Sequence, residues 1–92
     1  MERMTIIKND NMVGVDGKFF LIDCSSLPSN FHALQWYEDE SYGEIEWNSK
    51  PKPQNTPITS ISDYQTYLDL WNEKYAEYLA NNSDVEEHPE SE

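Results

Sequence analysis

The chain has 92 residues with 18 acidic and six Lys or Arg side chains, giving a formal net charge of −12. This acidic excess disfavours direct binding to nucleic acid or to an anionic membrane, because both favour patches of basic side chains. A domain of this size buries only about 60% of the surface that its unfolded chain exposes. Its three Trp, six Tyr and three Phe are therefore expected to supply much of the core.

The first part of the chain predicts three short antiparallel strands, over residues 5–8, 12–15 and 18–23. Residues 9–11 (NDN) form the first turn. The second turn, Asp16-Gly17, is a strong hairpin signal. The third strand is almost continuously apolar, which indicates burial on both faces or a partly covered outer face. The sequence therefore opens with a meander.

The segment after this meander contains the only cysteine, Cys24, which excludes an intramolecular disulfide. Its expected role is that of a buried, small apolar residue. A nucleophile would need a His and a third orienting group. His32 is available, but nothing else marks the pair, so catalysis is not expected. Residues 25–31 predict a loop or a single helical turn in which Leu27 and Phe31 close the end of the sheet.

A hairpin bounded by two Trp residues follows. Residues 32–36 (HALQW) and 43–47 (GEIEW) alternate apolar and polar side chains, which places Trp36 and Trp47 on the apolar faces of two strands. The turn and the second strand carry a cluster of carboxylates without a basic residue, namely Glu38, Asp39, Glu40, Glu44 and Glu46.

Residues 50–57 contain three Pro and two Lys residues and predict an extended connector, because proline cannot supply the N–H groups of a sheet ladder. Recognition by an aromatic groove is the alternative interpretation of this segment.

An amphipathic helix is predicted within residues 58–82. Ser60 and Ser62 are candidate N-caps, with Gln65 at the capping-box spacing from Ser62. Apolar residues then recur three and four positions apart to about Leu79, and two Asn residues are expected to end the helix. The seam consists of Ile61, Tyr64, Leu68, Trp71, Tyr75 and Tyr78. Residues 83–92 contain one apolar residue and five acids and predict a disordered acidic tail.

Together these elements predict an α+β fold, with a small antiparallel sheet of about five strands in residues 1–49 and one C-terminal helix. The helix seam fits a helix packed over a sheet and also fits the a/d pattern of a coiled coil. Side chains beside the seam widen its apolar surface. The predicted surface for a partner, or for self-association through the helix, comprises Tyr67, Leu70, Trp71 and Tyr78.

The order of these motifs resembles that of small proteins encoded beside the tail-fibre genes of tailed bacteriophages. The resemblance covers about residues 5–80, and its two Trp motifs are the more specific ones. The connector and the acidic tail depart from the pattern. The matching segments are residues 12–17 (MVGVDG), 21–23 (LID), 25–28 (SSLP), 32–36 (HALQW), 43–47 (GEIEW) and 61–65 (ISDYQ).

This resemblance implies a structural or chaperone-like assembly protein of the phage tail or tail fibre, which binds tail or fibre proteins and catalyses no reaction. The residues themselves show no metal-binding or phosphate-binding constellation, and no cofactor is expected. No apolar leader precedes the first strand and no stretch is long enough to span a membrane, so the expected location is the host cytoplasm during assembly, or the virion tail. The alternative is an acidic phage-encoded inhibitor of a host nuclease or defence protein, whose carboxylates replace DNA phosphates.

Overall fold

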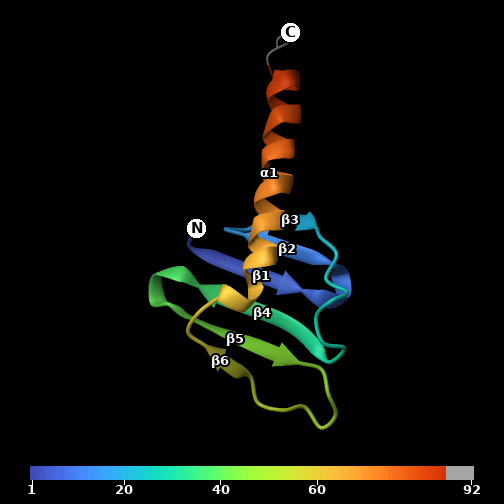
Figure 1. Ribbon diagram of the computed structural model, residues 1–92, viewed down its shortest axis with the longest axis vertical. Coiled ribbons are helices and arrows are strands. Elements are labelled where there is room, and N and C mark those ends of the chain that lie inside the picture. Colours follow the sequence, from blue (N-terminus) through green and yellow to red (C-terminus); the bar gives the residue numbers. More distant parts are fainter. Residues whose placement is uncertain (87–92) are drawn as a thin grey trace.

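The chain folds into one antiparallel sheet with a long helix on one face (Figure 1). The computed structural model describes the backbone of residues 1–86 and the side chains of residues 1–81. The sheet order is β3-β2-β1-β4-β5-β6. The α+β class predicted from the sequence is confirmed. The elements are β1 (Arg3–Ile7), β2 (Met12–Val15), β3 (Lys18–Leu21), β4 (Phe31–Tyr37), β5 (Tyr42–Trp47), β6 (Thr56–Ile58) and α1 (Gln65–Glu86).

The predicted meander and hairpin both form. The turn between β2 and β3 has positive φ at both central residues, 53° at Asp16 and 88° at Gly17, as a two-residue type I′ turn requires. Strand β1 pairs with β2 and also with β4, where Met4 lies opposite Trp36. This second pairing joins the meander to the Trp-bounded hairpin in a single sheet.

Strand β6 corrects the prediction that residues 50–57 form only a connector. Thr56–Ile58 pairs with β5 and places Pro57 opposite Glu44. Proline is tolerated here because β6 is the edge of the sheet, where a residue can turn its nitrogen away from the neighbouring strand.

Strand β3 forms the other edge and corrects a second expectation. Its side chains alternate, so that Phe20 packs against the core while Phe19 and Leu21 are 40% and 70% exposed. Burial of this strand on both faces, one of the two predicted alternatives, is therefore wrong.

Helix α1 starts later and ends later than predicted. A 3₁₀ turn over Ser62–Tyr64 precedes it, and the Ser60 hydroxyl oxygen accepts the Ser62 N–H at 3.1 Å. The capping box does not form, because the Ser62 N–H that Gln65 would accept is bonded to the Ser60 hydroxyl, and the Gln65 amide N–H donates to Asp69. The helix continues past Asn81 to Glu86, since Asn is only a weak helix breaker. The tail expected over residues 83–92 is thus helical to residue 86, and its remainder lies outside the described residues.

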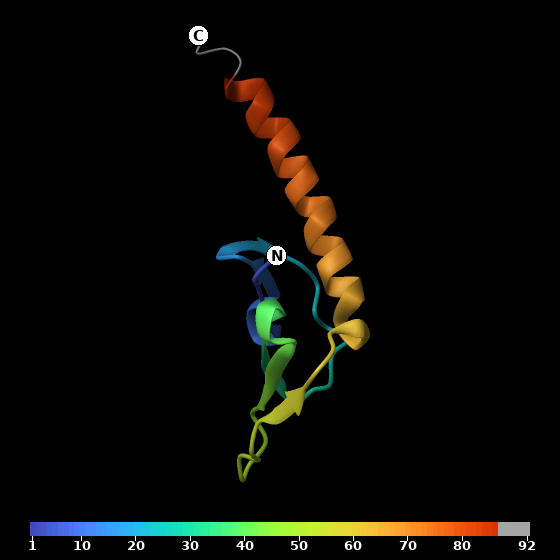
Figure 2. The same ribbon diagram turned by 90° about the vertical axis from the view of Figure 1, so that its left-hand side faces the viewer.

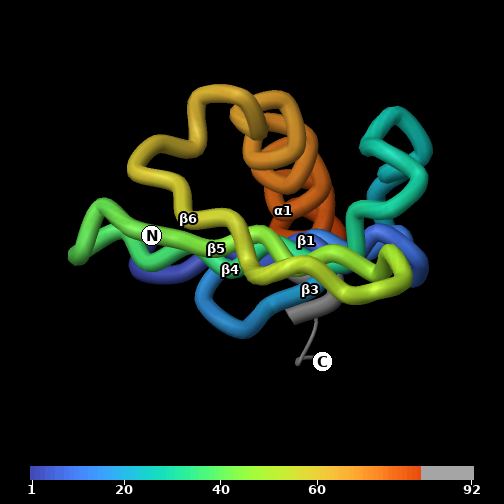
Figure 3. The backbone as a smooth tube through the Cα atoms, turned by 90° about the horizontal axis from the view of Figure 1, so that it is seen from below, coloured from blue at the N-terminus to red at the C-terminus, as the bar shows by residue number. Residues whose placement is uncertain are grey.

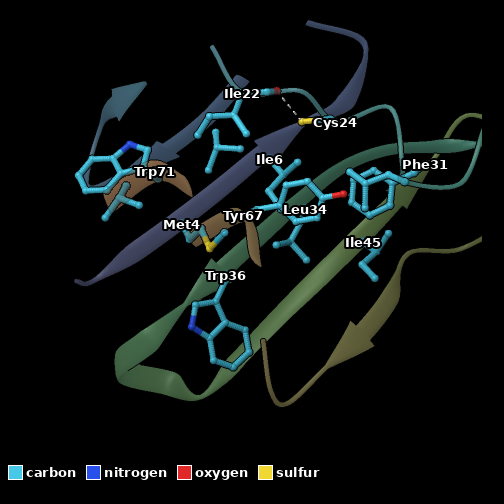
Figure 4. Close-up of a cluster of buried hydrophobic side chains, with 13 residues drawn as sticks. Met4, Ile6, Ile22, Cys24, Phe31, Leu34, Trp36, Ile45, Tyr67 and Trp71 are labelled. Carbon is cyan, nitrogen blue, oxygen red and sulfur yellow. Dashed lines mark hydrogen bonds between the residues drawn. The ribbon is translucent and has the colours of Figure 1, made fainter. Parts of the chain in front are cut away.

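The core lies between α1 and the sheet (Figure 4). Trp36 and Trp71 are buried in one cluster and Trp47 packs against it, as expected from the hairpin and helix patterns. Leu27 and Phe31 are buried in the same cluster, although Phe31 is the first residue of β4 and not part of the predicted loop. The segment that carries Leu27 lies on the same side of the sheet as α1 (Figure 3). The opposite face, which we call the outer face, has no layer of described chain over it.

Candidate protein-binding surfaces

The four helix residues predicted to form a partner surface divide into two buried and two exposed side chains. Tyr67 is 7% exposed and its hydroxyl lies 2.6 Å from the Ser26 hydroxyl. Trp71 is 6% exposed and its indole N–H donates to the Lys18 carbonyl oxygen at 2.9 Å. Both therefore belong to the core, and their assignment to an exposed partner surface is wrong. Leu70 and Tyr78 are exposed.

Tyr78 lies where α1 crosses β3. Its ring centroid is 5.8 Å from that of Phe20, and the Lys18 ammonium nitrogen lies 3.9 Å from the centroid of the Tyr78 ring. The next residue, Leu79, is 45% exposed. Beyond this crossing, α1 projects past the edge of the sheet (Figures 1 and 2).

Exposed apolar side chains therefore gather on both sides of strand β3. We call this group the edge patch and define it as Phe19 and Leu21 on the outer face with Tyr78 and Leu79 on α1. Sequence reasoning identified only Tyr78 of these four as a contact residue. The local sequence of β3 carries no signal for an edge position, since that position follows from the strand order.

The outer face carries a shallow groove of about 260 Å³ beside β3. Arg3 lines it, but the guanidinium of this residue is committed within the protein: it donates to the Gln35 side-chain oxygen at 2.6 Å and lies 5.3 Å from the centroid of the Tyr37 ring. The Thr5 hydroxyl donates to the same Gln35 oxygen at 3.0 Å. The side chains of Arg3, Thr5 and Gln35 on this face are therefore already hydrogen-bonded to one another.

The five carboxylates of the predicted acidic site lie on one hairpin but at two places. Glu38, Asp39 and Glu40 form an exposed 3₁₀ turn between β4 and β5. Glu44 and Glu46 lie two positions apart on β5, and their alternation with Ile45 places them on the outer face.

Two of these carboxylates are held by side-chain hydrogen bonds. The Trp36 indole N–H donates to Glu38 at 2.7 Å. Glu44 accepts the Tyr42 hydroxyl at 2.7 Å and the Asn55 amide at 3.1 Å, and these two hydrogen bonds lower the pKa of Glu44 below its usual 4.5. The charge on Glu44 therefore occupies a fixed position.

Cys24 is buried, as expected. Its side chain is fully buried, and its thiol donates to the Ile22 carbonyl oxygen at 3.2 Å. Burial, followed by the neighbouring Asp23 charge, raises the pKa of Cys24 above its usual value, which opposes formation of a thiolate. His32 Nδ1 is buried and has no hydrogen-bond partner among the described residues.

Within the part of the chain that the structure describes, no three His, Cys, Asp or Glu side chains converge as a metal site would require. The described helices also include none with the length and apolarity needed to cross a membrane. No protein-family model, curated protein or solved structure matches this chain.

Proposed function

We propose that this protein is a structural or chaperone-like assembly protein of a bacteriophage tail or tail fibre and acts by binding another protein. The edge patch supports a binding role, because exposed apolar side chains grouped on a small domain mark an interaction surface. The phage assignment rests on the resemblance carried by the two Trp motifs, HALQW and GEIEW. Phage tail or fibre proteins are the proposed partners.

The proposed contact is mainly apolar and draws on the exposed side chains of α1, namely Leu70, Tyr78 and Leu79. Burial of apolar surface depends little on ionic strength, whereas exposed charges are screened beyond about 8–10 Å near physiological salt. Binding through this surface should therefore persist at high salt.

The alternative, an acidic inhibitor of a host nuclease or defence protein, is favoured by one observation. Three consecutive exposed carboxylates occupy the β4–β5 turn, and the Trp36 indole fixes the first of them. A contact formed by these charges should weaken steeply as salt rises.

The experiment is a pull-down with the tagged protein from infected cells, at low and at high salt, with mass spectrometry to identify what is captured. One variant combines Leu70→Glu with Leu79→Glu, and another replaces the five hairpin acids by Gln or Asn. Glu73→Gln, an exposed change on the same helix, is the matched control.

Capture of a tail or fibre protein at both salt concentrations, lost only in the Leu variant, supports the assembly role. A host nuclease or defence protein that is lost at high salt and in the neutralised variant supports the inhibitor instead.

A further inference from the structure

We draw no further inference here: the strongest candidate, the open edge of the sheet along β3 where Phe19 and Leu21 are exposed, carries none because nothing in the structure shows what covers it.

Discussion

The Trp71 indole N–H donates to the Lys18 carbonyl oxygen at 2.9 Å, across 53 positions of the sequence. This hydrogen bond joins the N-terminal half of α1 to the edge strand β3. Phe20, next to Lys18, packs against the same indole with ring centroids 5.6 Å apart. The pair therefore fixes where the helix crosses the sheet edge, and with it the position of Tyr78 and Leu79.

Substitutions of Trp71 should separate the hydrogen bond from the packing. Trp71→Phe removes the indole N–H and should lower the free energy of unfolding by about 1–2 kcal/mol. Trp71→Ala also leaves a cavity and should cost about 3–5 kcal/mol, enough to unfold much of a marginal domain. Urea denaturation followed by circular dichroism measures both. Equal losses for the two variants would show that the hydrogen bond, not the packing, dominates.

The two hairpin Trp residues should differ, although their motifs are alike. Trp36 is 3% exposed, and Trp36→Ala should cost about 3–5 kcal/mol. Trp47 is only partly buried, against Phe31, and donates its N–H to Thr56 on β6 at 2.9 Å. Trp47→Ala should cost about 2 kcal/mol. Thermal unfolding of both variants tests this order, and a larger loss at Trp47 would contradict the observed burial.

Two glycines should tolerate a methyl group differently. A Cβ at Gly43 would lie 2.5 Å from the Gln35 carbonyl oxygen, which is held in the sheet. A Cβ at Gly14 would lie 2.5 Å from the Phe19 ring, which belongs to an exposed side chain on the edge strand. Gly43→Ala should therefore cost about 3 kcal/mol and Gly14→Ala about 1 kcal/mol.

A second substitution provides the control. Phe19→Ala should restore most of the stability lost in Gly14→Ala, since it removes the ring that the new methyl group meets. The same change should do nothing for Gly43→Ala. Chemical denaturation of the two double variants decides, and rescue of Gly43→Ala would place the clash elsewhere.

Acid should destabilise the fold through three hydrogen-bonded carboxylates. Backbone donors lower the pKa of Asp16 and Asp23, and side-chain donors lower the pKa of Glu44. A folded-state pKa below the unfolded value gives stability that is present above the unfolded pKa and is lost as pH falls through the folded one. The usual values are 3.8, 3.8 and 4.5, so the loss should begin near pH 4.5 and continue below pH 3.8.

The melting temperature measured between pH 7 and pH 2.5 tests this dependence. Glu44→Gln should make the fall shallower, and Glu77→Gln, at an exposed helix position, is the matched control. Identical profiles for the Glu44 variant and the unmodified protein would show that these hydrogen bonds do not favour the ionised carboxylate.

The parts of the fold that were predictable are those specified locally. Asp16 and Gly17 specify their turn because these residue types tolerate the positive φ that the turn requires. Residues 32–36 and 43–47 specify two strands because apolar and polar side chains alternate along them. Strand β6 was missed because a proline-rich segment has no local strand signal. Strand β6 pairs with β5 because the other side of β5 is occupied by β4 and this side is not, and because Pro57 can point its nitrogen away from β5.

Of the four helix residues predicted to form a partner surface, only Leu70 and Tyr78 are exposed, and the reason is geometric. Tyr64, Tyr67 and Trp71 are spaced three and four apart, and Tyr64, Leu68 and Trp71 are spaced four and three apart. Periodicity therefore allows either Tyr67 or Leu68 to lie at the centre of the buried stripe. In the structure the helix is oriented so that Tyr67 is buried, and its hydroxyl contacts the Ser26 hydroxyl. This contact joins segments that are distant in the sequence, so helix periodicity does not reveal it.

Pro57 also limits how large an assembly this sheet can build. A sheet can extend through many successive molecules only when both edge strands of each molecule can pair with a further strand. Here the β6 edge lacks an N–H donor at its central residue, so the sheet is poorly suited to extension through both of its edges.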